Sequence, residues 1–330
     1  MGSILVIVTG GAGFIGSVTL ELLSEHRERL GIDKVVIVDN LYSGSIRNIS
    51  HLLESEKFTF FNIDISNYNI LIEKLKPILE GYGGPIGIIH LAAIINIVEV
   101  LKDPKRGFEV NVNGTLNVLE LARTFDVERV VYASSVAVYG EPEHLPIDES
   151  HPLKPKNLYG LTKLFSEQLL WRYHEDYGVN VAALRYFNVY GPRMRSGPYA
   201  GVVHKFITAL LRGEQPIIHG DGEQTRDFVY VYDVAEANVK ALKSRVVGAI
   251  NIGSGRETKI NDLYRIICRI ISKCPKPKYG PPRKGDVRRS QASIRRARET
   301  LNWEPKTPLE KGLKETIKWH FSSPHMERRL

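Results

Sequence analysis

The sequence predicts an α/β protein with a doubly wound parallel sheet, and two observations support this prediction. The chain opens with a continuous apolar run at residues 3–9 that is rich in β-branched side chains, as expected for a parallel strand covered on both faces. Similar apolar runs recur along the first half of the chain, and long helical patterns accompany them. Further strands are predicted at residues 35–38, 58–61, 86–90 and 130–133, and long helices at 104–124 and 158–177.

A glycine-rich turn follows the first strand directly, with Gly10, Gly13 and Gly16, and an amphipathic segment continues to about residue 26. Glycines at these positions allow a tight turn, a close approach of the backbone to a pyrophosphate, and close packing of the helix. The N-terminus of that helix offers free N–H groups to phosphate. Because a strand precedes the turn and a helix follows it, the turn fits the dinucleotide fingerprint.

Asp39 ends the second predicted strand, 23 residues after Gly16. A carboxylate there can accept hydrogen bonds from the adenosine ribose hydroxyls and would repel a 2′-phosphate, so NAD is favoured over NADP. Two alternatives stay open. Asp39 could instead only cap a turn. The nearby Arg47 could allow the protein to use NADP to some extent.

Side chains suited to a ligand also follow the other predicted strands. Small residues after a strand let the backbone approach a flat ligand, and the carboxyl ends of strands in an open α/β sheet are where ligands bind. The positions concerned are Asp64 and Ile65 after the third strand, Leu91, Ala92 and Ala93 after the fourth, and Ser135 after the fifth.

Tyr159 and Lys163 are one helical turn apart in the predicted helix 158–177, so both side chains lie on the same face. A nearby cation favours the phenolate, so the pair could bring the tyrosine pKa of about 10 closer to neutral and make the phenol a base. Taken alone, a tyrosine and a lysine at this spacing more often form a solvated helix face. The cofactor fingerprint is what makes the catalytic interpretation stronger.

Composition limits the class of protein. The chain has 330 residues, 43% of them apolar, which allows a large core and a second lobe. It contains no run of eighteen apolar residues, and its start lacks a basic leader, so we expect a soluble, cytoplasmic protein with no membrane partner. Two cysteines, Cys268 and Cys274, are too few for a disulfide framework, and no His/Cys cluster has metal-ligand spacing, so no metal is expected.

The positive charge is concentrated in one stretch. The chain carries a net charge of +8, and between residues 276 and 298 there are nine Lys or Arg side chains and one acid, Asp286. Nucleic-acid binding is one interpretation of such a stretch. It contains a single aromatic residue, Tyr279, and no nucleic-acid motif. We therefore expect no nucleic-acid partner, and instead one or two arginines directed at a small phosphorylated ligand.

Taken together, these motifs resemble a known family. The order and approximate spacing of the extended short-chain dehydrogenase/reductases are matched by TGGAGFIG, DNLYSGS, HLAA, NVNGT, SSVAVYG, YGLTK and RYFNVYGP. Within that group the chain is most similar to the NAD-dependent nucleotide-sugar epimerases, in particular those that interconvert UDP-glucose and UDP-galactose. The resemblance extends over residues 5–319 and implies a UDP-sugar substrate, bound NAD and a reversible hydride transfer through a 4-keto sugar.

The resemblance also implies a role for each matching position. Tyr159 would be the base, Lys163 would hold the nicotinamide ribose and lower the Tyr159 pKa, and Ser135 would shuttle the proton. The NAD-binding positions would be Gly10, Gly13, Phe14, Ile15, Gly16, Asp39, Asn40, Ser43, Gly44, Asp64, Ile65, Leu91, Ala92, Ala93, Asn111, Tyr159, Lys163 and Phe187. The substrate-binding positions would be Ser135, Tyr159, Asn188, Arg226, Arg283, Asp286 and Ser290, with Asn188 and the arginines at the diphosphate.

The residues after Ser135 bear on which reaction is catalysed. Related 4,6-dehydratases have an Asp-Glu pair there and related decarboxylases a Glu, because those reactions need a further proton-transferring group. Val136 and Ala137 occupy these positions, and neither side chain can transfer a proton, which favours epimerisation. Two residues depart from the pattern, since Ala137 and Val100 replace a common Thr and Ser. Ser290 leaves room where some epimerases have a bulky side chain, so N-acetylated sugars are expected to be accepted.

The resemblance further implies a doubly wound Rossmann sheet with a smaller α/β substrate-binding lobe. The NAD-binding domain is expected at residues 1–185 and about 225–255, and the substrate-binding lobe at 186–224 and 256–330. A homodimer through the two long helices is implied as well. The alternatives are a UDP-glucuronate 4-epimerase or another NAD(P)-dependent nucleotide-sugar oxidoreductase, and a non-catalytic NAD-binding regulator.

Overall fold

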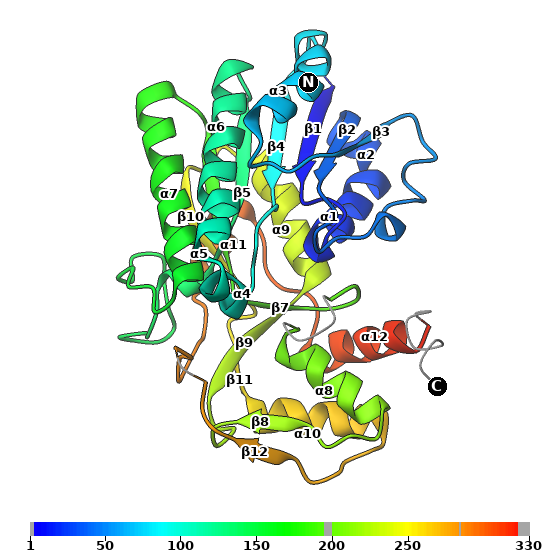
Figure 1. The fold of residues 1–330 in the computed structure, drawn as a ribbon, viewed down its shortest axis with the longest axis vertical. Coiled ribbons are helices and arrows are strands. Elements are labelled where there is room, and N and C mark those ends of the chain that lie inside the picture. The colour runs from blue at the N-terminus through cyan, green and yellow to red at the C-terminus, as the bar shows by residue number, and fades with distance from the viewer. Residues whose placement is uncertain (1–2, 195–199, 284, 323–330) are drawn as a thin grey trace.

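A seven-stranded parallel sheet forms the larger part of the molecule, shown in the upper half of Figure 1. The computed structural model describes residues 3–194, 200–283 and 285–322. The strand order across the sheet is β10-β6-β5-β4-β1-β2-β3. These strands are β1 (Ile4–Thr9), β2 (Ile32–Asp39), β3 (Phe58–Asn62), β4 (Ile86–His90), β5 (Arg129–Ser135), β6 (Val181–Tyr186) and β10 (Gly248–Ile252).

Helices cover both faces of this sheet, so the predicted doubly wound α/β fold is confirmed. Each face has its own apolar core, and the β-branched strands contribute alternate side chains to the two cores. One face is covered by α3 (Tyr68–Glu80), α6 (Gly114–Thr124) and α7 (Leu158–Tyr177). The other is covered by α1 (Phe14–Glu25), α9 (Val231–Lys243) and α11 (Arg295–Leu301).

The strand order reverses between β1 and β4. From β1 the chain builds outward through β2 to β3, and it then returns to the other side of β1 and continues through β4, β5 and β6. Connections on the two sides of this point leave the sheet in opposite directions, which opens a crevice at the carboxyl ends of the strands. The glycine turn after β1 and the Ser135 loop after β5 both border this crevice.

A smaller group of strands and helices lies beyond the carboxyl ends of the sheet, in the lower half of Figure 1. Its two small sheets have the orders β11-β9-β7 and β12-β8, and its three helices share a separate apolar core. The strands are β7 (Asn188–Tyr190), β8 (Ile217–His219), β9 (Thr225–Tyr230), β11 (Glu257–Lys259) and β12 (Lys278–Gly280). The helices are α8 (Val202–Leu211), α10 (Ile260–Ile271) and α12 (Leu309–Ser322).

The chain returns to the large sheet after residue 230. Within the expected return segment 225–255, α9 and β10 join the large sheet, whereas β9 pairs with β7 and β11. The exact division into two domains stays a prediction. Parts of the expected smaller lobe, namely residues 195–199, 284 and 323–330, lie outside the described residues.

One predicted helix differs from the structure. The segment 104–124 is not a continuous α-helix, because α5 (Pro104–Phe108) and α6 are joined by a π-helical turn, Glu109–Asn113. The turn places Asn111 in the interior, where its backbone carbonyl accepts hydrogen bonds from Thr115 Oγ1 (2.6 Å) and Ser166 Oγ (2.8 Å). These side-chain donors replace the regular helical partners, a local adjustment often found near functional sites.

Two composition-based expectations can also be compared with the structure. Both cysteines are free, Cys268 buried in α10 and Cys274 exposed. Within the described ranges, no helix combines the length and apolar character needed to cross a bilayer.

Candidate active site

A cavity of about 930 Å³ lies at the crevice between the large sheet and the smaller group of elements. Of all the predicted site residues, only Gly44 and Asn111 are not part of its lining. Residues that are far apart in the chain, such as Gly10, Ser135 and Arg283, therefore share one cavity. Their binding and catalytic roles stay predictions, but their grouping is a structural fact.

The glycine turn is shaped by two close approaches of backbone to backbone. An ideal Cβ on Gly10, whose φ is +71°, would lie 2.7 Å from the Ala92 nitrogen. An ideal Cβ on Gly16 would lie 2.1 Å from the Gly10 oxygen. Gly13 precedes α1, and no side chain of the described residues caps that helix end. The turn is thus a cradle that a larger side chain would fill, and its uncapped N–H groups fit a dinucleotide pyrophosphate.

Asp39 joins the glycine turn to the next loop. Its Oδ2 accepts a hydrogen bond from the Ala12 nitrogen (3.0 Å) and its Oδ1 from the Leu41 nitrogen (2.8 Å). Burial raises the pKa of the Asp39 carboxyl, and these backbone N–H groups act against that rise. These contacts are the ones expected if Asp39 caps a turn, the alternative role considered for it. The carboxylate also lines the cavity, so a role toward a ribose is compatible with them.

Gly44 supports this loop from behind. An ideal Cβ on Gly44 would lie 2.9 Å from both the carbonyl carbon and the oxygen of Ala12, and Ser45 N donates to that oxygen at 3.0 Å. Gly44 was predicted to bind the cofactor. The residue packs the loop closely against the glycine turn and does not line the cavity, and its role toward the cofactor stays a prediction.

The predicted catalytic residues come from the end of β5 and the first turns of α7. Ser135 Oγ accepts a hydrogen bond from the Ala137 nitrogen (3.2 Å). Asn157 caps α7 by accepting from the Gly160 nitrogen (2.9 Å), and an ideal Cβ on Gly160 would lie only 2.5 Å from the Ala137 oxygen. Gly160 therefore lets α7 approach the Ser135 loop closely, a role that the sequence analysis missed.

In the protein without NAD the pKa of Tyr159 is not lowered, and the expectation that Lys163 lowers it together with the cationic nicotinamide ring stays a prediction. Burial raises the pKa of Tyr159 to about 12, and a hydrogen bond with Ser135 opposes the rise. Lys163 is buried, donates from Nζ to the Ala133 oxygen (2.8 Å), and lies 4.8 Å from the centre of the Tyr132 ring. Burial lowers the pKa of Lys163 itself to about 7, so its charge is only partial near neutral pH. For both groups the loss of hydration on burial changes the pKa more than the neighbouring partner does.

A buried ion pair lies behind these residues. The Glu167 carboxylate, fully buried, pairs with Arg185 (2.7 Å) and accepts a hydrogen bond from Ser134. Its negative charge opposes the fall in the Lys163 pKa. Ser134 is thus buried and engaged within the protein interior.

Asn111 was predicted to take part in cofactor binding, and the structure gives it a different place. Its Oδ1 accepts from the Ile94 nitrogen (2.8 Å), and its Nδ2 donates to the Ile94 oxygen (2.9 Å) and to Thr162 Oγ1 (3.0 Å). Both amide hydrogens are therefore used within the protein. Asn111 joins the loop after β4 to the catalytic helix α7, and it positions the site from outside the cavity.

The predicted substrate residues occupy the opposite side of the cavity. Arg226 forms an ion pair with Asp286 and donates to the Val287 oxygen (2.9 Å), so these two predicted ligands are already paired with each other. Asn188 Nδ2 donates to the Asp227 oxygen (3.3 Å). Ser290 is 1% exposed, and within the described part of the chain its buried Oγ has no hydrogen-bond partner although the residue lines the cavity.

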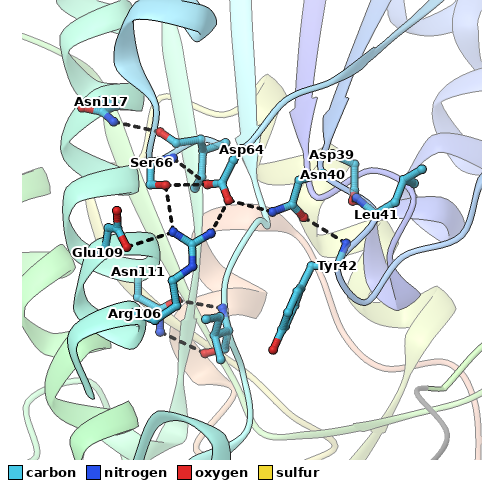
Figure 2. Close-up of polar contacts among 12 residues, drawn as sticks. Asp39, Asn40, Leu41, Tyr42, Asp64, Ser66, Arg106, Glu109, Asn111 and Asn117 are labelled. Atoms are coloured by element: carbon cyan, nitrogen blue, oxygen red, sulfur yellow. Dashed lines mark hydrogen bonds and ion pairs between the residues drawn. The ribbon is translucent and has the colours of Figure 1, made fainter. Parts of the chain in front are cut away.

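Several lining residues were not found from the sequence. Lys205 lies on α8, where burial and the positive charge of Arg283 lower its pKa. Arg106 on α5 forms an ion pair with Asp64, as Figure 2 shows. Lys205 is the single Lys, Arg, Asp or Glu of the largely apolar helix α8, and Arg106 follows Lys105 on the short helix α5. Only the tertiary fold shows that these two side chains line the cavity.

A dinucleotide-binding turn that shares a cavity with a Ser-Tyr-Lys trio defines an NAD-dependent enzyme of the short-chain dehydrogenase/reductase type. Comparison with known proteins agrees. The model of the NAD dependent epimerase/dehydratase family matches residues 6–253. A putative UDP-glucose 4-epimerase of Methanocaldococcus jannaschii is 42% identical over 318 residues, which cover 96% of this chain and 98% of that protein.

Solved structures show the same similarity. A UDP-glucose 4-epimerase from Thermotoga maritima, solved with UDP-glucose, has a TM-score of 0.88 and 36% identity, covering 96% of this chain and 98% of that one. A UDP-N-acetylglucosamine 4-epimerase from Methanobrevibacter ruminantium M1, solved with UDP-N-acetylmuramic acid, has a TM-score of 0.88 and 35% identity, covering 98% and 99%. The chain belongs to the NAD dependent epimerase/dehydratase family. This confirms the resemblance, the fold class and the NAD cofactor predicted from the sequence.

Proposed function

We propose that the protein is a UDP-hexose 4-epimerase that interconverts UDP-glucose and UDP-galactose, and that it also accepts UDP-GlcNAc and UDP-GalNAc. The observation that carries the proposal is the composition of the loop beside the catalytic trio. Val136 and Ala137 line the cavity directly after Ser135, and neither side chain can give or take a proton. An elimination or a decarboxylation would need a further proton-transferring group at these positions, whereas inversion at C4 does not.

In this proposal the trio acts on the sugar 4-hydroxyl. Tyr159 takes the proton of that hydroxyl, and Ser135 hydrogen-bonds the same oxygen and relays the proton. Bound NAD would supply a reversible hydride acceptor for the carbon that carries this hydroxyl, so that the hydride could leave one face of the sugar and return to the other, and the positive charge of NAD would favour the phenolate. Lys163 is held by the Ala133 carbonyl at 2.8 Å, which supports a fixed position for its ammonium beside the cofactor ribose.

The diphosphate is assigned to the cationic side of the cavity. Arg226, Arg283 and Lys205 line it, together with Asn188. Burial first, and then the positive charge of Arg283, lower the pKa of Lys205, so a bound polyanion would offset the repulsion between these two like charges. Because Arg226 is paired with Asp286 in the protein alone, we expect its guanidinium to reorient or to share its donors when the substrate binds.

Ser290 supports the extension to N-acetylated sugars. Its side chain is small, lines the cavity, and in the described part of the chain has an unpartnered buried hydroxyl that a ligand group could satisfy. A homodimer is also proposed, through α6 and α7. Phe165 and Tyr177 on α7 are 45% and 55% exposed, which supports an apolar surface available to a second copy.

The test is a substrate panel run without added cofactor. Purified protein is incubated separately with UDP-glucose, UDP-galactose, their N-acetyl forms and UDP-glucuronate, and the products are separated by ion-exchange chromatography while absorbance at 340 nm reports any released NADH. We expect conversion of the two hexoses and of the N-acetyl sugars, with no accumulation of free NADH. Turnover of UDP-glucuronate alone, or stoichiometric release of NADH, would contradict the proposal.

Two variants sharpen this test. Tyr159→Phe removes only the hydroxyl, so turnover should fall by about 10²- to 10⁴-fold, the usual contribution of one general base, while NAD content and UDP binding stay unchanged. Ser290→Tyr should abolish turnover of the N-acetyl sugars and leave the plain hexoses as substrates. A Tyr159→Phe protein with ordinary activity would contradict the assigned base.

A further inference from the structure

Asp64, which was predicted to contact the cofactor, has its hydrogen-bonding capacity filled by the protein itself. Oδ1 accepts from Ser66 N (2.9 Å) and Ser66 Oγ (2.6 Å). Oδ2 accepts from Asn40 Nδ2 (2.9 Å) and from Arg106, as Figure 2 shows. An ionised carboxyl group offers about four acceptor positions, and four donors occupy them. No position is left for the amine of an adenine ring unless one of these donors moves away.

The donors that surround Asp64 come from three different segments. Asn40 follows β2, Ser66 follows β3, and Arg106 lies on α5, so the carboxylate ties together the loops that border this side of the cavity. The hydrogen bonds from Ser66, Arg106 and Asn40 lower the pKa of Asp64 against the effect of burial, so the group is ionised at neutral pH. Asp64 is therefore suited to hold its neighbours in place.

Hydrogen bonds hold Arg106 at the edges of its guanidinium group, and part of the side chain stays exposed. Nη1 donates to Ser66 Oγ (3.2 Å) and to Glu109 Oε2 (3.0 Å), and Nη2 donates to Asp64. All of these contacts lie at the rim of the guanidinium, because its N–H groups point outward in the plane of the group. The side chain is nevertheless 36% exposed, and it lines the cavity. A flat cation with its rim fixed and part of its surface accessible is a platform on which an aromatic ring can stack.

We propose that Arg106 is the stacking platform for the adenine ring of NAD, and that Asp64 acts as a positioning residue that holds the plane of the guanidinium in one orientation. Three features of this part of the cavity fit a purine. The neighbouring lining residues Ile63 and Ile65 are apolar, Asn40 and Asp64 lie directly beside Arg106, and Asp39, the residue assigned to the adenosine ribose, precedes Asn40 in the chain. The inference uses only the bound NAD, so it holds for any sugar substrate.

The experiment measures NAD affinity in the full-length protein. Holoprotein is exchanged against isotopically labelled NAD, and the affinity and release rate are compared for wild type, Arg106→Leu, Arg106→Lys and the control Lys105→Leu. Lys105 is the exposed neighbour on the same helix and does not line the cavity. We expect Arg106→Leu to bind NAD about 2- to 30-fold more weakly, the range of one cation–π contact, and Lys105→Leu to match wild type.

Arg106→Lys separates stacking from simple charge pairing. A lysine keeps the positive charge beside Asp64 but has no flat face, so its NAD affinity should fall nearly as far as that of Arg106→Leu. Lysine restoring wild-type affinity would overturn the proposal, because Arg106 would then act only through its ion pair. Wild-type affinity in Arg106→Leu would overturn it as well.

A second cofactor separates stacking from recognition of the adenine amine. Nicotinamide hypoxanthine dinucleotide keeps the flat purine and replaces the amine with an oxygen. If Arg106 acts by stacking, Arg106→Leu should weaken the binding of either dinucleotide by the same factor. A loss seen with NAD and absent with the hypoxanthine form would mean that Arg106 works by directing Asp64 toward the amine. If circular dichroism shows that Arg106→Leu does not fold, the affinities of Arg106→Lys for the two dinucleotides still test the proposal. Turnover of sugars is not the readout, so failure here is distinguishable from failure of the proposed epimerase.

Discussion

Replacing Gly16 with alanine should weaken both the fold and NAD binding. The ideal Cβ would lie 2.1 Å from the Gly10 oxygen and 2.7 Å from the Gly11 Cα, and both neighbours are backbone atoms. Ordinary contacts begin near 3.4 Å, so helix α1 and the glycine turn must separate by about 1.3 Å, the difference between 3.4 and 2.1 Å. No side-chain rotation can relieve the clash, because no flexible side chain is involved.

The expected cost is about 1–3 kcal/mol, the usual range for forcing an extra methyl group into a packed site. In the NAD-free protein this should appear as a lower urea midpoint with an unchanged slope. A turn displaced by about 1 Å also loses its fit to the pyrophosphate. If NAD binding must restore the native turn, a strain of about 1–3 kcal/mol corresponds to roughly 5- to 140-fold weaker NAD binding.

Gly13→Ala provides the matched comparison. Its Cβ would meet only the Gly10 oxygen, at 3.2 Å, and Gly13 lines the cavity. We expect its stability to stay within about 1 kcal/mol of wild type, whereas NAD content falls because the methyl group occupies the cradle. Gly83→Ala is a neutral control, since within the described chain no atom lies within 4 Å of its added Cβ. Urea unfolding and NAD measured by absorbance after denaturation test all three. A Gly16→Ala protein with wild-type stability and full NAD content would refute the packing argument.

Two pH-dependent predictions follow from buried bases. The pKa of Lys163 lies near 7 in the NAD-free protein against 10.5 ordinarily, so between these values the unfolded chain binds a proton that the native protein does not. Stability should therefore rise with pH by about 1.4 kcal/mol per unit from pH 7 to 10, and urea unfolding of Lys163→Met should lack this component. The ring of the buried His320 contacts that of His204 in a tilted arrangement, with 4.8 Å between the ring centres, and burial first, then the charge of His204, lowers the pKa of His320 to about 4. Native stability should therefore fall as the pH drops from 6.5 to 4, and His320→Phe should show a smaller fall; an equal fall in both proteins would remove His320 as the cause.

The fold was predictable in its main features because local patterns and distant packing agree. The runs 86–90 and 158–177 match β4 and α7 to the residue, since both sit between clear turn signals. The split of the predicted helix 104–124 by a π-helical turn was not predictable. It depends on Asn111, whose amide is engaged by the Ile94 backbone and by Thr162, residues that only the folded chain brings beside it.

The candidate site also has features that could be predicted from the sequence and features that could not. By itself the sequence determined the cofactor class and the family, and it predicted the catalytic trio, because a glycine turn, a strand-end acid and a tyrosine-lysine turn are short motifs whose chemistry is local. Only the tertiary structure decided how these groups are charged and paired. Burial raises the Tyr159 pKa instead of lowering it, Arg226 is paired with Asp286, and the rim of Arg106 is fixed by Asp64 and Glu109. Desolvation and long-range pairing depend on what surrounds a group in space, and spacing along the chain does not contain that information.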